Sequence, residues 1–247
     1  MDHHGGVAEL AVSLLSSAIA GLAVAIFSQV RRRRQIERLR AFFGVQPGSR
    51  PLIIVSQHES LTSTTSVHLH DAAGVVEMAA MLMRCGGEPD LVGQDQAPPS
   101  LGSVTEVCVG GPRTSARVAT HLRLLLPGVT YEVDEPGFPI TVGGRRYVAE
   151  GDLTHVLLAK VYGPQGGSPV FLISGQFAED NRAAARYLTR HHAELMRRYG
   201  RTDRFAVILR LRGVAVYGND AVEAVDHVTP AAFAAGDSDG IPSHFDG

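Results

Sequence analysis

The hydrophobic pattern of the chain opens on residues 7–30, which read as one apolar helix, and arginines follow directly at 31–34. Between residues 10 and 27 the only polar side chains are serines, and this run is long enough to cross a hydrocarbon core of about 30 Å. Basic residues resist translocation and stay on the cytoplasmic side of a membrane. We therefore expect a single-pass transmembrane helix over 7–30 in the cell membrane, with the N-terminus outside and the main domain cytoplasmic.

Two other interpretations of residues 7–30 stay open, a cleavable signal peptide and a buried core helix. A signal peptide carries its basic residues before the apolar run, whereas here the arginines come after it. A core helix normally shows one polar stripe, and this segment is apolar all round. Ser17, Gly21 and Ala25 have the small-residue spacing that suits helix pairing, so a homodimer through this helix is a further prediction.

A basic juxtamembrane collar is expected over residues 31–50, between the membrane and the domain. The helix should continue from the arginines to about Gly44 and be broken by Pro47 and Pro51. The only basic run of the chain lies here, beside the expected lipid bilayer, so anionic headgroups account for it.

Residues 51–218 alternate short apolar runs with amphipathic stretches, which is the pattern of an α/β domain. The run at 52–55 is typical of a strand buried on both faces. The order of strands and helices implies right-handed crossovers and a Rossmann-like, mostly parallel sheet flanked by helices. The expected strands are 52–55, 90–92, 104–109, 156–161, 170–173 and 205–211, and the expected helices are 71–84, 113–126 and 180–199.

An antiparallel hairpin insertion is expected in the middle of this domain. Short strands are expected at 131–133, 140–142 and 146–148, with Gly143 and Gly144 forming a hairpin turn. The insertion adds antiparallel strands to an otherwise parallel α/β fold.

The remaining connections are expected to be less regular. A Gly- and Pro-rich loop is expected at 163–169, and residues 214–217 are expected to pair with the last core strand. Residues 219–247 are rich in Ala, Asp, Gly and Ser and have little to bury, which predicts a flexible tail.

Composition narrows the compartment and the partners. The formal net charge is −2, so nothing favours nucleic acid as a partner. Of the 23 basic residues only Lys160 is a lysine, and together with abundant Ala, Gly and Val this indicates a high-GC bacterial genome. Cys85 and Cys108 make no disulfide framework, which agrees with a reducing cytoplasm. Cys108 lies in an expected strand, and we expect an inert buried thiol.

A candidate binding site lies where the expected strand 104–109 ends. Gly110 and Gly111 allow a close approach of the backbone, and a helix begins directly afterwards with unpaired N–H groups and a positive dipole end. Ligands of open parallel sheets bind at this edge. Arg113, Thr114 and Ser115 add donors that suit a phosphate, a carboxylate or a nucleotide. The alternative is an ordinary strand-to-helix turn with a Thr or Ser cap, because no nucleotide fingerprint is present.

A second loop, at Gly175, also follows an expected core strand. The helix after it begins with Glu179 and Asp180, whose carboxylates complement the helix dipole and would repel an anion. We therefore expect the loop at Gly175 to form a rim of the site rather than a phosphate cradle.

Candidate catalytic residues are confined to one polar loop. His58 and Glu59 follow the first strand, and either has the chemistry of a general base. His68 and His70 have a spacing that can converge on a metal, but the rest of a metallohydrolase signature is missing. Surface histidines are the alternative, and no metal is assigned. No residue pattern identifies a cofactor.

Two stretches resemble elements of largely uncharacterised bacterial Rossmann-like proteins, many of which are carried on one membrane span. Residues 107–115 resemble a strand–Gly-Gly-Pro–x–Ser–Asn–helix element, and residues 172–188 resemble a strand–Gly–spacer–Gly-Thr–x–Ala-Ala–helix element. This chain has Ser115 where Asn is expected, Asn181 where Thr is expected and Asp180 where the second Gly is expected. The resemblance implies the fold and the topology, with Asn181 joining the candidate ligand-binding positions.

These observations favour a non-enzymatic, membrane-tethered module that senses a small anionic or nucleotide-like ligand or docks a cytoplasmic protein partner. One alternative is a nucleotide-processing enzyme, such as a hydrolase or glycosidase, that uses the same crevice with Glu59 or His58 as general base. Another is a structural scaffold with a degenerate site.

Overall fold

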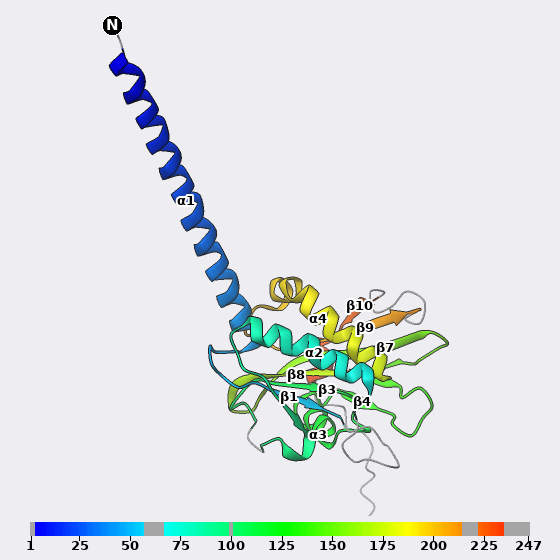
Figure 1. Cartoon of the computed structure of the whole chain (residues 1–247). Helices are drawn as coiled ribbons and strands as arrows, with labels where there is room; N and C mark the ends of the chain where they lie inside the picture. The colour runs from blue at the N-terminus through cyan, green and yellow to red at the C-terminus, as the bar shows by residue number, and fades with distance from the viewer. Residues whose placement is uncertain (1–2, 57–66, 99–100, 214–221, 235–247) are drawn as a thin grey trace, which may run out of the picture.

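A long helix, α1 (His3–Phe43), projects from an α/β domain (Figure 1). The computed structural model describes residues 3–56, 67–98, 101–213 and 222–234, with side chains described from residue 21 onward except at residue 95. The predicted continuous helix through the apolar segment and the arginines is confirmed. It ends at Gly44, whose φ of 65° is typical of a residue that follows a helix C-terminus.

The apolar half of α1 is only partly described. Residues 21–35 are all exposed, and no helix built from the described side chains is long and apolar enough to cross a membrane. More than half of the predicted span, residues 7–20, has side chains outside the described part. The transmembrane helix over 7–30 therefore stays a prediction.

The centre of the domain is a seven-stranded sheet made of β1 (Leu52–Val55), β2 (Asp90–Gly93), β3 (Glu106–Val109), β7 (Leu153–Gly163), β8 (Gly166–Gly175), β9 (Phe205–Arg212) and β10 (Val222–His227). Their order is β10-β9-β7-β8-β3-β1-β2. The neighbours β2, β1, β3 and β8 are parallel, whereas β7 and β10 run in the opposite direction. The expected mostly parallel sheet flanked by helices is confirmed.

The connection between β7 and β8 is a tight hairpin. Gly163 pairs with Gly166, so the strands continue through most of the segment that we predicted as a loop at 163–169. Gly166 and Gly167 have φ values of 75° and 94°, which residues other than glycine rarely adopt. Because a short hairpin joins only antiparallel strands, this turn also reverses β7 relative to β8.

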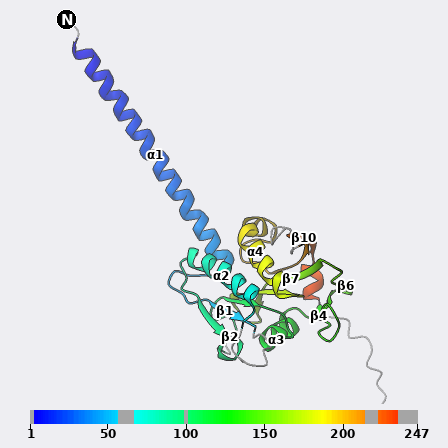
Figure 2. The same cartoon turned by 45° about the vertical axis from the view of Figure 1, so that its right-hand side comes forward.

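Helices cover both faces of the sheet, and the strands supply side chains to each. α2 (Leu69–Arg84) and α4 (Ala178–Tyr199) pack together on one face, and α3 (Ala116–Leu125) lies on the other (Figures 1 and 2). Within β1, Ile53 and Val55 join the core under α2 and α4, while Leu52 and Ile54 join the core under α3. This alternation confirms the prediction of a strand buried on both faces.

The predicted hairpin insertion forms its own three-stranded antiparallel sheet. Its strands are β4 (Val129–Tyr131), β5 (Ile140–Val142) and β6 (Arg145–Tyr147), in the order β4-β5-β6. Gly143 and Gly144 connect the last two strands with φ values of 55° and 82°, as a two-residue hairpin turn requires.

A short 3-10 helix, η1 (Gln94–Gln96), follows β2.

The end of α1 belongs to the core of the domain. Phe42 and Phe43 are fully buried, and the ring of Phe43 lies 5.2 Å from the ring of Phe171 in β8. Leu39 and Val45 are also buried in the same cluster. The expected collar over 31–50 is therefore wrong in its second half, because apolar side chains at the end of the helix pack beneath the sheet. The domain begins near Leu39 rather than at residue 51.

The expected flexible tail over 219–247 is wrong for its first part. β10 pairs antiparallel with β9, and α6 (Thr229–Phe233) buries Ala232 against the sheet. The small side chains of this segment are enough to hold it on the domain, because β9, with which β10 pairs, supplies the apolar surface. The strand that we expected at 214–217 and the rest of the tail lie outside the described residues.

Candidate functional site

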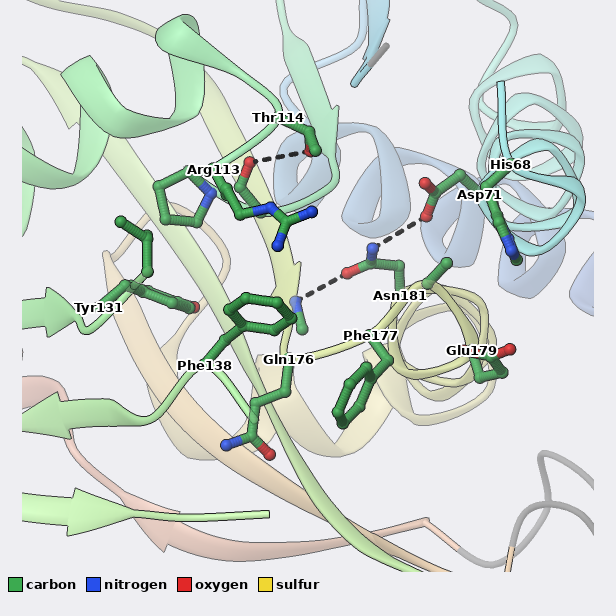
Figure 3. Close-up of a pocket in the computed structure, with 15 residues that line it drawn as sticks. His68, Asp71, Arg113, Thr114, Tyr131, Phe138, Gln176, Phe177, Glu179 and Asn181 are labelled. Atoms are coloured by element: carbon green, nitrogen blue, oxygen red, sulfur yellow. Dashed lines mark hydrogen bonds between the residues drawn. The ribbon is translucent and has the colours of Figure 1, made fainter. Parts of the chain in front are cut away.

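A pocket of about 300 Å³ lies beyond the carboxyl ends of β3 and β8, beside the start of α2 (Figure 3). We call it the crevice. It has the volume of a small-ligand site and the location that ligands occupy in open α/β sheets. Its walls come from the start of α2, the turn after β3, the β4–β5 insertion and the start of α4. The lining residues are His68, Asp71, Gly111, Pro112, Arg113, Thr114, Tyr131, Val133, Phe138, Gly175, Gln176, Phe177, Ala178, Glu179 and Asn181.

The crevice brings together most of the residues that the sequence indicated. Gly111, Arg113, Thr114, Gly175 and Asn181 all line it. The other two candidate positions, Gly110 and Ser115, are not among its lining residues. The catalytic candidates His58 and Glu59 lie outside the described residues, so their relation to the crevice stays open.

The two glycines after β3 have different roles. Gly110 has a φ of 126°, its N–H donates to the Ile173 carbonyl (3.0 Å), and a Cβ there would collide with the hydroxyl of Ser56. Gly110 is therefore required by the backbone path. Gly111 faces the crevice, and among the described residues a Cβ added there would meet only the Gly175 carbonyl, at 3.5 Å. The missing side chain of Gly111 leaves space in the crevice, and the backbone conformation does not require a glycine there.

The start of α3 is capped by the protein itself. The Ser115 hydroxyl accepts a hydrogen bond from the Val118 N–H (3.3 Å), and the Ala116 N–H donates to the side-chain oxygen of Gln94 (2.9 Å). The Thr114 hydroxyl donates to the Gly111 carbonyl (3.4 Å). These bonds use donors that we expected to face an anion. The arrangement favours the alternative interpretation, a capped strand-to-helix turn, for Thr114 and Ser115.

Asn181 connects three elements behind the crevice. Its side-chain oxygen accepts a hydrogen bond from the Gly175 N–H (2.7 Å), and its side-chain nitrogen donates to Asp71 (2.8 Å). Both side chains are buried. Burial raises the pKa of Asp71, against the lowering effect of the Asn181 hydrogen bond. The resemblance implied a ligand contact for Asn181, but the structure commits its amide to holding β8, α4 and α2 together.

Asp180 caps the start of α4 from within the protein. Its carboxylate accepts hydrogen bonds from the Phe177 N–H (2.8 Å) and from the Thr154 hydroxyl (2.6 Å). Burial raises the pKa of Asp180 to about 6, although both hydrogen bonds favour the charged form. This self-capped helix start agrees with the expected rim beside Gly175.

An aromatic wall completes the crevice, and the sequence analysis missed it. The rings of Phe138 and Phe177 lie 6.0 Å apart, and the Arg113 guanidinium lies 4.8 Å from the centre of the Phe138 ring (Figure 3). The Tyr131 hydroxyl donates to the Ser174 carbonyl (2.8 Å), which fixes its ring at the edge of the pocket. Tyr131 and Phe138 belong to the insertion. No motif in the sequence marked these two side chains, because the insertion reaches the crevice only through the tertiary fold.

His68 and His70 both belong to the N-terminus of α2. The Nδ1 atom of His68 accepts a hydrogen bond from the His70 N–H (3.3 Å), which makes His68 rather than Asp71 the capping residue. The Nε2 atom of His70 lies 3.5 Å from the Glu179 carboxylate. One ring nitrogen of His68 is thus used in capping α2. His70 faces the carboxylate of Glu179 across the rim of the crevice.

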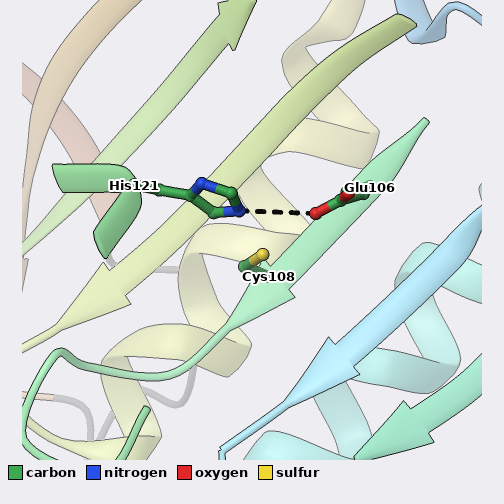
Figure 4. Close-up of side chains that lie close together, drawn as sticks. All are labelled: Glu106, Cys108 and His121. Carbon is green, nitrogen blue, oxygen red and sulfur yellow. Dashed lines mark hydrogen bonds and ion pairs between the residues drawn. The ribbon is translucent and has the colours of Figure 1, made fainter. Parts of the chain in front are cut away.

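A second polar cluster, Glu106, Cys108 and His121, lies between β3 and α3 (Figure 4). Their ligand atoms lie within 4.8 Å of one another, but Arg117 already pairs with Glu106 through two hydrogen bonds (2.6 and 3.1 Å). His121 lies 3.4 Å from the same carboxylate. Burial alone would raise the pKa of Glu106, yet its bonds to His121 and Arg117 outweigh burial and lower it.

Charge therefore argues against a metal in this cluster. The guanidinium of Arg117 neutralises the carboxylate and would repel a cation, and burial raises the pKa of the Cys108 thiol. The buried thiol that we expected at Cys108 is confirmed. We interpret the cluster as a buried ion pair that joins α3 to β3 and so supports the turn at 110–115.

Comparison with known proteins adds no family to this description. No protein-family model matches the chain, and no curated protein matches its sequence significantly. The resemblance to bacterial Rossmann-like proteins on one membrane span stays a prediction from the two motifs.

Proposed function

We propose that this protein is a membrane-tethered cytoplasmic Rossmann-like module that senses a small anionic, nucleotide-like ligand in the crevice. The observation that carries the proposal is the convergence of Arg113 with aromatic side chains at the carboxyl edge of the sheet. Aromatic rings stack on flat heterocycles, and a guanidinium pairs with phosphate or carboxylate groups. The crevice therefore combines recognition of a ring with recognition of an anion.

The acidic side of the crevice suits the sugar of such a ligand. Glu179 lines the rim, and its side chain is 44% exposed. Carboxylates near the switch point of Rossmann-like sheets accept hydrogen bonds from ribose hydroxyls. We propose that a base lies against the aromatic wall, a sugar lies toward Glu179, and an anionic group faces Arg113.

Binding without turnover is supported by how the polar groups of the crevice are used. Asn181 bonds Gly175 and Asp71, and Gln176 bonds the backbone of His155 and Tyr147. These side chains hold loops in place instead of aligning on a reacting atom. A preformed pocket of this kind suits a sensor or a docking module.

The ligand proposal is tested by thermal unfolding of the full chain in neutral detergent with a panel of nucleotides and phosphorylated metabolites. A ligand at 100 times its dissociation constant adds about 2.7 kcal/mol to the free energy of unfolding. Arg113→Gln and Phe177→Ala should abolish the ligand-dependent gain. A matched control is Arg204→Gln, since Arg204 lies 4.1 Å over the ring of Phe233, away from the crevice. A flat response across the panel would instead support a structural scaffold.

A second candidate function, a nucleotide-processing enzyme, is favoured by Asp71. Its carboxyl lines the crevice, is buried, and has a raised pKa, as a general acid or base requires. Turnover of a nucleotide that disappears in Asp71→Asn, with ligand binding retained, would establish this function. Binding of the same nucleotide without product formation would exclude it.

The tether is a separate part of the proposal. It is supported by the apolar run at 7–30 and the arginines behind it. A reporter that is active only in the periplasm, fused to the C-terminus, should stay inactive, and the full chain should sediment with membranes after a high-salt wash. An active C-terminal reporter, or release of the chain by salt, would refute the tether and leave the crevice unaffected.

A further inference from the structure

A second groove lies where α1 leaves the domain, near the C-terminal end of α4, whereas the crevice lies at the start of that helix. It has a volume of about 1100 Å³ and is bounded by α1, the last turn of α2 and the second half of α4. The two helix ends that bound it meet α1 at the base of its projecting part (Figures 1 and 2). We call it the arginine groove.

Six arginines line the arginine groove, and no carboxylate is among the described residues that line it. Within the described part of the chain, its arginines form no ion pair, although other arginines of the domain do. Unlike a solvated surface of mixed charge, this arrangement concentrates positive potential in one concave place. The arginines are Arg31, Arg32 and Arg38 of α1, Arg84 of α2, Arg197 of α4 and Arg201 after it.

Helix dipoles account for only part of this concentration. Arg84 and Arg197 lie in the last turns of α2 and α4, where cations complement the negative helix ends. Arg31, Arg32 and Arg38 lie on α1 before its last turn, so its own helix end does not account for them. Because they share the groove with three further arginines, they raise the electrostatic free energy of the empty groove, and a bound anion would lower it.

The walls of the groove are held in a fixed relation. Leu39 lines it and is buried, and Phe42, one turn later on α1, packs in the core. The buried amine of Lys160 donates to the Arg201 carbonyl (2.6 Å) and lies 4.8 Å from the Phe42 ring. Lys160 thus connects the end of α1 to the turn that carries Arg201. The groove is preorganised rather than formed by a loose arm.

We propose that the arginine groove binds a phosphate-bearing group, supplied by the headgroup of an acidic phospholipid or by a soluble polyphosphate. Guanidinium groups recognise phosphate through paired, charge-assisted hydrogen bonds. Ile36 and Met196 also line the groove, so a phosphate with attached acyl chains would find apolar contacts beside the arginines. This site is distinct from the crevice and does not depend on a ligand there.

The test titrates the full chain in neutral detergent micelles and follows its unfolding temperature. One arm adds phosphatidylglycerol, with phosphatidylcholine at the same mole fraction as control, and the other adds inorganic tripolyphosphate. Arg84→Gln/Arg197→Gln should weaken the apparent affinity for the active probe by at least about tenfold. Arg33→Gln/Arg34→Gln removes the same amount of charge, at two residues of α1 that do not line the groove, and should leave the affinity unchanged.

Each outcome decides the proposal. A response to phosphatidylglycerol alone assigns the groove to lipid headgroups, and a response to tripolyphosphate alone assigns it to a soluble ligand. No response to either probe, or equal weakening by both double variants, would overturn the site. If Arg84→Gln/Arg197→Gln lowers the unfolding temperature without any probe, Arg32→Gln/Arg38→Gln on the exposed side of the groove replaces it, with the same expected loss.

Discussion

At the scale of single residues, several polar side chains behind the crevice hydrogen-bond to the protein itself and keep its walls in place. Asn181 bonds the Gly175 N–H and the Asp71 carboxyl, and Asp180 bonds the Phe177 N–H. A sequence motif locates such residues but does not tell whether they face a ligand or the protein. Only their partners, which are distant in the chain, decide between the two.

Asn181 should be needed for stability as well as for binding. Asn181→Ala leaves the buried carboxyl of Asp71 without its donor and should lower the free energy of unfolding by about 1–3 kcal/mol, measured by urea denaturation. Asn181→Asp keeps an acceptor for Gly175 but places a second carboxyl beside Asp71. It should be more destabilising at neutral than at acidic pH, and equal effects at both pH values would contradict the arrangement.

Asp180 should give the stability of the protein a specific pH dependence. Burial raises its folded pKa from 3.8 to about 6, so the folded state binds this proton more tightly than the unfolded state. The contribution is fully present below the unfolded pKa and is lost as the pH rises through about 6. The free energy of unfolding of the natural protein, minus that of Asp180→Asn, should therefore fall over this interval in urea titrations. A difference that is flat with pH would contradict a buried, self-capping carboxyl.

At the scale of elements, the two adjacent glycines of the turn after β3 have different roles: one is required by the fold, and the other leaves space in the crevice. Gly110 passes behind the crevice with a positive φ, and Gly111 faces into it. The sequence presented them as equivalent, because a pair of glycines signals a close approach without saying to what. The buried ion pair between Glu106 and Arg117 then holds α3, and so the turn, against the sheet.

Alanine at the two positions should have opposite consequences. Gly110→Ala combines a φ that disfavours a side chain with a collision at Ser56, and should cost about 1–3 kcal/mol of stability or more. Gly111→Ala should unfold at nearly the natural temperature, because in the part of the chain that the structure describes its Cβ would meet nothing but the Gly175 carbonyl, at 3.5 Å. Thermal unfolding of both variants checks this prediction. If the two substitutions lowered the unfolding temperature by a similar amount, the backbone would be equally constrained at Gly110 and Gly111.

At the scale of the whole molecule, α1 is both a projecting rod and part of the core. Its exposed stretch carries three of the six arginines of the groove, and its last turn buries Phe42 and Phe43 against β8 and β9. Whatever α1 is embedded in, its orientation relative to the domain is set by this aromatic packing. A ligand in the arginine groove would therefore act on a rigid junction.

The true domain boundary should be visible in truncated and substituted chains. Phe43→Ala opens a fully buried site and should cost about 3–5 kcal/mol. A chain that begins at Gln46 removes Phe42 and Phe43 and should lose cooperative unfolding, whereas a chain that begins at Gln35 should retain it. Circular dichroism melts of the two fragments make the comparison, and cooperative unfolding of the shorter one would return the boundary to residue 51.

Local pattern predicted the elements well where neighbours in the chain decide the outcome. The apolar run of β1, the Gly143-Gly144 turn and the helix through the arginines all form where the sequence indicated. Each depends on periodicity or on backbone freedom, which act over a few residues. The same order of strands and helices also predicted that a site would lie at the carboxyl edge of the sheet.

What the sequence by itself determined is therefore the α/β class, the mostly parallel sheet and the turn that carries the crevice. The tertiary structure decided the rest, because the rest depends on contacts between residues far apart in the chain. It placed Tyr131 and Phe138 of the insertion opposite Arg113, committed Asn181 to Asp71, and buried the end of α1. It also gathered arginines from three helices into one groove, which no single stretch of sequence displays.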